Sequence, residues 1–190
     1  MKARDNPFAV DRLHRLRFRL PESSWPQLLM QWDDMNHRGA IVGPEGRGKT
    51  TMLLELADVL RRRQWNVRLA TLRRAQANAW RELPSDLLLN LDARDCILLD
   101  GGEQLGFFAW QRFLHRTKAA GGLVVTLHRA GRLPTWFHCA TSVELLDDLV
   151  SELLGSLDDS VRSVNRHLFE KYGGNLRLAL REWYDLYAAM

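Results

Sequence analysis

Cysteine and histidine occur too rarely, and too far apart, to build a metal centre or a disulfide framework. The sequence has two cysteines, Cys96 and Cys139, which form no CxxC pair. We therefore interpret both as reduced packing residues. The six histidines form neither an H-x₃₋₅-H nor an H-E-x-x-H pattern. We expect no metal site built on cysteine or histidine ligands.

The sequence also lacks long apolar runs. No run approaches the ~18 apolar residues that a membrane-spanning helix needs, and residues 1–20 are charged rather than typical of a signal peptide. Internal repeats and low-complexity blocks are absent as well. We expect a soluble, cytoplasmic protein without membrane insertion. Its 190 residues, 46% of them hydrophobic, suffice for one good core, which predicts one domain with an appendage.

Basic residues exceed acidic ones only slightly. Lys and Arg number 27 against 23 Asp and Glu, a formal charge of +4, which permits a nucleic-acid or other acidic partner without requiring one. In residues 12–20, basic side chains alternate with leucine and phenylalanine. A half-buried strand with solvated arginines explains this alternation more simply than a binding face does, so the partner stays open.

Residues 43–50, GPEGRGKT, are the most informative part of the chain. They match G-x-x-x-x-G-K-[ST], a loop that binds the phosphates of nucleoside triphosphates. The apolar residues 40–42 predict a buried strand entering the loop, and residues 51–60 predict a helix with one apolar face leaving it. Strand, glycine loop and helix in this order predict a bound nucleoside triphosphate.

Phosphate chemistry explains the residue types in this loop. Gly43 and Gly48 allow backbone dihedrals that other residues avoid, so that successive N–H groups turn toward the β-phosphate beside a helix N-terminus. Lys49 is expected to reach the β- and γ-phosphates, and the hydroxyl of Thr50 to ligate Mg²⁺. The predicted nucleotide contacts in this stretch are Gly43, Pro44, Glu45, Gly46, Arg47, Gly48, Lys49, Thr50 and Thr51.

Predicted strands alternate with predicted helices along the chain, which indicates an α/β fold with a parallel sheet. Besides the strand before the loop, the expected strands are residues 66–71, 96–100, 121–128 and 141–145. The expected helices after the first are an amphipathic segment, 105–119, and two final helices at about 160–172 and 175–188. Residues 80–91 have a mixed helical pattern that Pro84 interrupts.

Asp100 ends the apolar run 96–100. A carboxylate at the C-terminal end of a buried parallel strand lies beside the phosphate loop, where it can hold a Mg²⁺-bound water. We therefore predict that Thr50 and Asp100 serve the metal together. An ATPase usually needs a further acid to orient the attacking water. Gly101 follows Asp100, so Glu103 is the next candidate.

Five stretches, taken in order, resemble the AAA+ ATPases, most closely small bacterial members and the related STAND ATPases. They are NPF at 6–8, GPEGRGKTT at 43–51, CILLDGGEQL at 96–105, VVTLH at 124–128 and GGNLR at 173–177. Only the phosphate loop is specific by itself; the others gain weight from their order.

The resemblance covers about residues 6 to 188 and implies a P-loop NTPase fold. That fold is an α/β domain with a roughly five-stranded, mainly parallel sheet flanked by helices, followed by a small C-terminal helical lid. The implied divisions are an N-terminal flanking segment, 1–38, a nucleotide-binding core, 39–150, and the lid, 151–190.

The resemblance also implies roles for three further residues. Thr126 or His128, at the end of the fourth strand, corresponds to a sensor that hydrogen-bonds the γ-phosphate or the attacking water. The alternative is an ordinary strand threonine and a surface histidine. Arg177 resembles the lid arginine that reaches the γ-phosphate, because Gly173-Gly174 can end one helix and Asn175 can cap the next. A solvated lid arginine is the alternative.

One departure from the family bears on activity. The adjacent Asp-Glu pair of active AAA+ enzymes is replaced by Asp100-Gly101, with Glu103 displaced, so we expect a slow ATPase that acts as a nucleotide-dependent switch on a protein or nucleic-acid partner. Three arginines are candidates for a finger that acts on a neighbouring subunit, but nothing in the sequence selects among them: Arg116, Arg129 and Arg132.

Other functions share the phosphate loop. An ATP-bound adaptor would use it with little hydrolysis. A small-molecule kinase would need arginines on a mobile lid, and the candidates are Arg73, Arg74, Arg81 and Arg94. A GTPase is disfavoured because residues 100–103 break the D-x-x-G pattern and no N-K-x-D motif occurs. The predicted ligands are therefore ATP and Mg²⁺.

Overall fold

The computed structural model describes residues 6–13, 15–20, 24–73 and 79–189. By their contacts these residues form two compact units. The sheet unit contains residues 19–43 and 49–138, whereas the helical unit contains residues up to 18, residues 44–48 and residues from 139 onward. The two units are described separately below. The loop formed by residues 43–50, called the 43–50 loop from here on, contributes residues to both.

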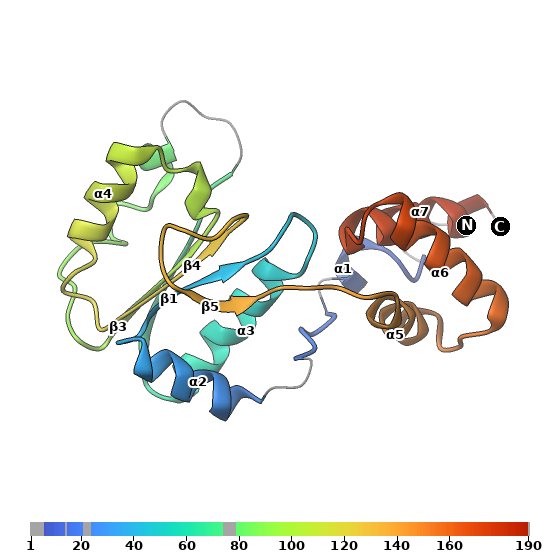
Figure 1. Cartoon of the computed structure of the whole chain (residues 1–190), viewed down its shortest axis with the longest axis horizontal. Helices are drawn as coiled ribbons and strands as arrows, with labels where there is room; N and C mark the ends of the chain where they lie inside the picture. The colour runs from blue at the N-terminus through green and yellow to red at the C-terminus, as the bar shows by residue number, and fades with distance from the viewer. Residues whose placement is uncertain (1–5, 14, 21–23, 74–78, 190) are drawn as a thin grey trace. The chain divides into compact units, whose positions relative to one another are not determined.

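A five-stranded, wholly parallel sheet is the centre of the sheet unit (Figure 1). Its strands are β1 (Arg38–Val42), β2 (Asn66–Thr71), β3 (Asp95–Asp100), β4 (Gly122–Leu127) and β5 (Thr135–His138), in the spatial order β2-β3-β4-β1-β5. Nearly every residue of β1, β3 and β4 is buried, as the two covered faces of a parallel sheet require. The predicted α/β fold with a five-stranded parallel sheet is confirmed.

Helices cover both faces of this sheet. α2 (Trp25–Asp34) and α3 (Lys49–Arg62) lie on one side and α4 (Phe107–Arg116) on the other (Figure 1). The connection from β1 to β2 runs along the sheet in the opposite direction to the connection from β3 to β4. Because such crossovers are right-handed, the helices within them must lie on opposite faces. Short 3₁₀ turns, η2 (Ala79–Glu82) and η3 (Gly102–Gln104), complete the unit.

Alternate side chains of β3 reach the two faces. Ile97 and Leu99 pack in one buried cluster with Trp110 and Phe113 of α4, which explains the amphipathic pattern of that helix. The predicted mixed helix at 80–91 is shorter than expected, because only η2 is helical and turns follow it.

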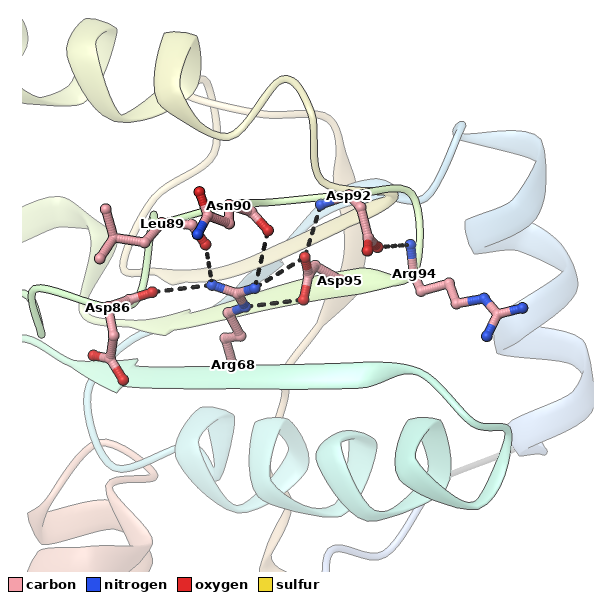
Figure 2. A network of polar contacts seen from close by, with 7 residues as sticks. All are labelled: Arg68, Asp86, Leu89, Asn90, Asp92, Arg94 and Asp95. Atoms are coloured by element: carbon pink, nitrogen blue, oxygen red, sulfur yellow. Dashed lines mark hydrogen bonds and ion pairs between the residues drawn. The ribbon is translucent and has the colours of Figure 1, made fainter.

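The turn segment after η2 is held by one arginine. Arg68, on the edge strand β2, forms a two-pronged ion pair with Asp95, at 2.9 and 3.1 Å. Its guanidinium also donates to the carbonyl oxygens of Asp86 (3.0 Å) and Leu89 (2.6 Å) (Figure 2). The Asp95 side chain is almost completely buried, so this charge is paired and the segment 84–92 is anchored to the sheet.

Among its described residues, the helical unit has four helices: α1 (Val10–Leu13), α5 (Val143–Leu154), α6 (Asp159–Lys171) and α7 (Leu176–Ala189). Their apolar faces meet in one core, in which Phe8 stacks on Trp183 with ring centroids 5.4 Å apart. Positions and lengths of α6 and α7 confirm the two predicted C-terminal helices. α5 spans residue 150, where the sequence placed a boundary.

Two predictions of local structure are wrong. Residues 141–145 are not a strand, because Ser142 caps α5 by accepting a 3.2 Å hydrogen bond from the backbone N–H of Leu145. The fifth strand is β5 instead, which follows Pro134 and buries only Trp136 and Phe137. Residues 16–20 are also not a strand; they have no regular structure. Within the described ranges, no helix is long and apolar enough to span a membrane.

Candidate functional site

The 43–50 loop connects β1 to α3. Gly46 and Gly48 have φ angles of 74° and 84°, which a residue with a side chain rarely adopts. Gly43 is not among the described glycines with positive φ. The unusual backbone conformation that the sequence predicted at Gly43 therefore occurs at Gly46 instead. Lys49 begins α3 and is buried, and its ammonium donates a 2.6 Å hydrogen bond to the carbonyl oxygen of Gly43. Thr51 is half-buried in the first turn of α3.

Asp100, at the end of β3, is the centre of a hydrogen-bonded cluster in the sheet unit. One of its carboxylate oxygens accepts from the hydroxyl of Thr50 at 2.9 Å, and the other accepts from the hydroxyl of Thr126 at 2.6 Å. The hydroxyl of Thr126 also accepts from the N–H of Gly101 at 2.8 Å. The parallel sheet therefore brings together three residues that the sequence predicted for one site.

Thr126 and His128 differ in their freedom to meet a ligand. Thr126 is buried, and its only O–H is committed to Asp100. His128 lies one residue beyond β4, with 43% of its side chain exposed, and its Nε2 is 3.2 Å from a carboxylate oxygen of Glu103. Of the two sensor candidates, His128 is the accessible one.

Glu103 has one partner and one buried oxygen without a partner. While Oε1 faces His128, Oε2 is shielded from solvent and has no hydrogen-bond partner in the described part of the chain. Sequence reasoning named both residues but not their pairing. The adjacency of β3 and β4 in the sheet, which places the ends of these strands side by side, is the signal that predicts it.

The structure explains why no acid follows Asp100 directly. Gly101 has a φ of 83°, and a Cβ atom there would lie 2.7 Å from the carbonyl oxygen of Leu72. A glutamate at this position would be strained and would clash. The next acid after Asp100 is therefore Glu103, which lies in η3. Arg132, one of the candidate arginine fingers, braces this turn by donating to the carbonyl oxygens of residues 102 and 105 at 2.9 and 2.7 Å.

The middle of the 43–50 loop is held within the helical unit. The guanidinium of Arg47 donates to the hydroxyl of Thr141 and to the carbonyl oxygen of Gly173, both at 2.6 Å. Thr141 in turn donates to the carbonyl oxygen of Gly174 at 2.8 Å. The side chain of Arg47 is thus bound to other groups of the protein. The predicted contact between Arg47 and a nucleotide would therefore have to come from its backbone N–H.

Gly46 approaches the start of α7 closely. Its carbonyl oxygen accepts from the N–H of Leu176 at 3.2 Å, and a Cβ atom on Gly46 would lie 1.8 Å from the side-chain oxygen of Asn175. Asn175 caps α7, as predicted, by accepting from the N–H of Leu178 at 3.2 Å. Only glycine fits at position 46.

Arg177 lies in the first turn of α7. Its guanidinium is 3.6 Å from a carboxylate oxygen of Glu45 in the 43–50 loop, and both side chains are exposed. The structure therefore places the predicted lid arginine beside a loop residue within the helical unit. Pro44, the remaining predicted contact, is exposed next to Glu45.

The donor set suits a hard divalent cation. No group of three or more His, Cys, Asp or Glu side chains that could hold a metal ion occurs among the residues described. Thr50 and Asp100 nevertheless present a hydroxyl and one carboxylate 2.9 Å apart. Mg²⁺ typically takes one or two carboxylates and completes its octahedron with water and phosphate oxygens. The two residues fit such a site.

Both cysteines are free and buried. Burial raises the pKa of the Cys96 thiol far above its ordinary value, so it stays protonated and unreactive at neutral pH. Cys96 therefore belongs to the core of the sheet and contributes no nucleophile to the site.

No family model matches this chain, and no curated protein matches its sequence.

Proposed function

We propose that this chain binds ATP with Mg²⁺ at the 43–50 loop and acts as a slow ATPase that switches a protein or nucleic-acid partner. The observation that carries the proposal is the 2.9 Å hydrogen bond between Thr50 and Asp100. The sequence assigned both residues to one metal, the first from the loop pattern and the second from a strand end. Their contact supports that assignment.

In this proposal the loop binds the triphosphate in the manner of a P-loop. Positive φ angles at Gly46 and Gly48 are typical of a backbone that turns its N–H groups toward an anion. The N-terminus of α3 adds its partial positive charge. Lys49 begins that helix, so its ammonium would contact the β- and γ-phosphates as well as the carbonyl oxygen of Gly43.

Mg²⁺ would be held by the hydroxyl of Thr50 and, through water, by the carboxylate of Asp100, in the Walker B arrangement. The ion supplies neutralisation of the charge on the β- and γ-phosphate oxygens. Thr126 positions Asp100 through its 2.6 Å hydrogen bond. Because Thr50 donates to the other carboxylate oxygen, both oxygens of Asp100 are held in place by hydroxyl groups. A fixed carboxylate loses less conformational entropy on binding than a free one does.

The sheet topology favours the same edge for a ligand. β1 is followed by a helix on one face and β3 by a helix on the other, with β4 between them. In open α/β sheets, ligands bind outside the carboxyl ends of strands where the connections diverge in this way. Gly43, Asp100 and His128 all lie directly at or after the carboxyl ends of these three strands.

Glu103 and His128 are the candidates for hydrolysis. Glu103 is the first acid after Asp100 in the sequence, and its Oε1 lies 3.2 Å from His128, so this carboxylate is the candidate that orients the attacking water. His128 would contact the γ-phosphate because it is exposed and next to Glu103. The absence of an acid at position 101 is the reason to expect slow turnover.

Two alternatives remain: an ATP-bound adaptor without hydrolysis and a small-molecule kinase. For the kinase, Arg81 and Arg94 are exposed, and Arg74 lies outside the described residues. Steady-state phosphate release from ATP and Mg²⁺ separates the three functions. Release without any acceptor, lost in Lys49→Met, supports the ATPase. Phosphoryl transfer that requires an added acceptor indicates the kinase, and binding without release indicates the adaptor.

A further inference from the structure

Two aromatic side chains at the start of α4 lie in solvent. Phe107 is 69% exposed and Phe108 is 86% exposed. Their rings meet edge to face, with centroids 5.6 Å apart and an angle of 80° between the planes. Other aromatic side chains of α4, Trp110 and Phe113, are buried against the sheet. The exposed pair is therefore not required for the core, and both rings are accessible to a ligand.

Cations continue the same face of α4. Phe108, Arg112 and Arg116 follow one another at intervals of four residues, so they lie on one stripe of the helix. All three are exposed. Between Glu103 and Glu144 the sequence has no Asp or Glu, whereas arginines and a lysine recur throughout that interval. The stripe is thus aromatic at one end, cationic at the other, and free of acidic neighbours along its own helix.

A third aromatic residue adjoins the cations. The guanidinium carbon of Arg112 lies 4.7 Å from the centre of the Trp80 ring, a distance at which the ring attracts the cation. Arg116 donates a long, 3.4 Å hydrogen bond to the carbonyl oxygen of Leu88. Trp80 and the two arginines line a hollow of about 160 Å³ together with Pro84, Ser85 and Leu88.

The hollow is small and its wall is fixed. Pockets for drug-sized ligands measure roughly 300–1,000 Å³, so this one suits a part of a longer ligand rather than a small molecule. The wall segment is anchored by Arg68, which binds the carbonyl oxygens of Asp86 and Leu89 (Figure 2). This part of the wall is therefore formed before a ligand arrives, which reduces the entropy lost on binding.

We propose that this surface, formed by Trp80, Phe107, Phe108, Arg112 and Arg116 and called the α4 face, binds single-stranded nucleic acid. Exposed aromatic rings stack on unpaired bases of any sequence, and arginines contact the phosphates between them. Charge complementarity favours a polyanion. The exposed rings of Phe107 and Phe108 favour a strand with unpaired bases over a duplex.

The inference does not depend on the proposed ATP site. None of the residues of the α4 face belongs to the 43–50 loop or to the cluster around Asp100. Binding to the α4 face is therefore expected without ATP, and in Lys49→Met as well as in the wild type.

Fluorescence anisotropy of the full chain with a labelled oligothymidylate of about 20 nucleotides tests the proposal, because binding sites of this type cover roughly 4–16 nucleotides. Phe108→Ala should weaken binding about tenfold or more by removing one stacking contact. Since Phe108 is almost wholly exposed, the melting temperature should not change. The double variant Arg112→Ala/Arg116→Ala should reduce the slope of log K against log salt by about 1.4, at about 0.7 for each phosphate contact.

The matched control is Arg61→Ala/Arg62→Ala, which removes the same charge from the exposed end of α3. It should leave the affinity within about twofold, apart from the long-range effect of net charge, which salt screens. Equal losses in the control and the α4 double variant would overturn the proposal, as would unchanged binding in Phe108→Ala. Absence of oligonucleotide binding together with binding to anionic lipid vesicles would assign the α4 face to a membrane surface and would also overturn it.

Discussion

The hydroxyl of Thr50 donates a 2.9 Å hydrogen bond to the carboxylate of Asp100, fifty residues further along the chain. Thr50 follows a glycine loop and Asp100 ends a buried strand, and a parallel sheet is what joins them. Asp100 is also held by Thr126 from the next strand. This pair of residues is the basis of the proposed Mg²⁺ site.

Asp100→Asn should therefore weaken triphosphate binding in Mg²⁺ much more than in EDTA. An amide keeps the size of the side chain and accepts from Thr50 or Thr126, but it carries no charge to attract the hydrated ion. The measurement is the ATP affinity of wild type and variant in each buffer. Equal losses in both buffers would make Asp100 a structural residue.

Glu103→Gln should abolish most phosphate release while ATP affinity stays within a few-fold. The carboxylate at 103 is the next acid after Asp100 in the sequence, and glutamine cannot act as a base. Gln104→Ala is the matched control, because it changes the neighbouring residue of η3 without removing an acid. Full turnover in Glu103→Gln would show that hydrolysis uses another group.

Arg177→Ala should reduce the preference for ATP over ADP and leave ADP affinity nearly intact. Arg177 is paired with Glu45 at 3.6 Å in an exposed ion pair, and such pairs contribute about 1 kcal/mol or less. A terminal phosphate can therefore displace Glu45 at little cost. Arg181→Ala, an exposed arginine one turn later in α7, is the control. Unchanged affinities for both nucleotides would show that Arg177 is a solvated surface residue that does not contact the nucleotide.

The stability of the helical unit should depend on pH through Glu182. A hydrogen bond from Lys171 lowers the pKa of Glu182 below its ordinary value of 4.5, and a hydrogen bond from Tyr172 lowers it further to a smaller extent. A lowered pKa means that the stabilisation is present above pH 4.5 and is lost as the pH falls through the lower, folded value. Glu182→Gln should lower the melting temperature at neutral pH. Wild type and variant should converge in acid, and a constant difference would refute the assignment.

Four of the five strands were readable from the sequence as short segments with clear ends. The run before Gly43 and the run ending at Asp100 are examples, and their parallel pairing follows from the helices between them. β5 was missed because it buries only Trp136 and Phe137 and therefore has no apolar run. The segment 141–145 was mistaken for a strand because Ser142 was not identified as the residue that caps the N-terminus of α5.

Long-range contacts of the site were not readable. Arg47 bonds to Thr141 and Gly173, which are 94 and 126 residues away, and nothing local in the sequence indicates this. The pairing of Glu103 with His128 also depends on the strand order, which periodicity alone does not fix. In contrast, the closeness of Thr50 and Asp100 was predictable, because one residue follows the loop after β1 and the other ends β3, and both strands end at the same edge of a parallel sheet.

The most direct test of the proposed function is the thermal unfolding of wild type and Lys49→Met with and without ATP and Mg²⁺. At 100 times its dissociation constant, a ligand adds about 2.7 kcal/mol to the free energy of unfolding, or about 5–10 °C for a chain of this size. We expect this shift in the wild type and in the control Lys118→Met, and little or none in Lys49→Met. A wild-type melting temperature that does not move, or an equal shift in Lys49→Met, would contradict ATP binding at the 43–50 loop.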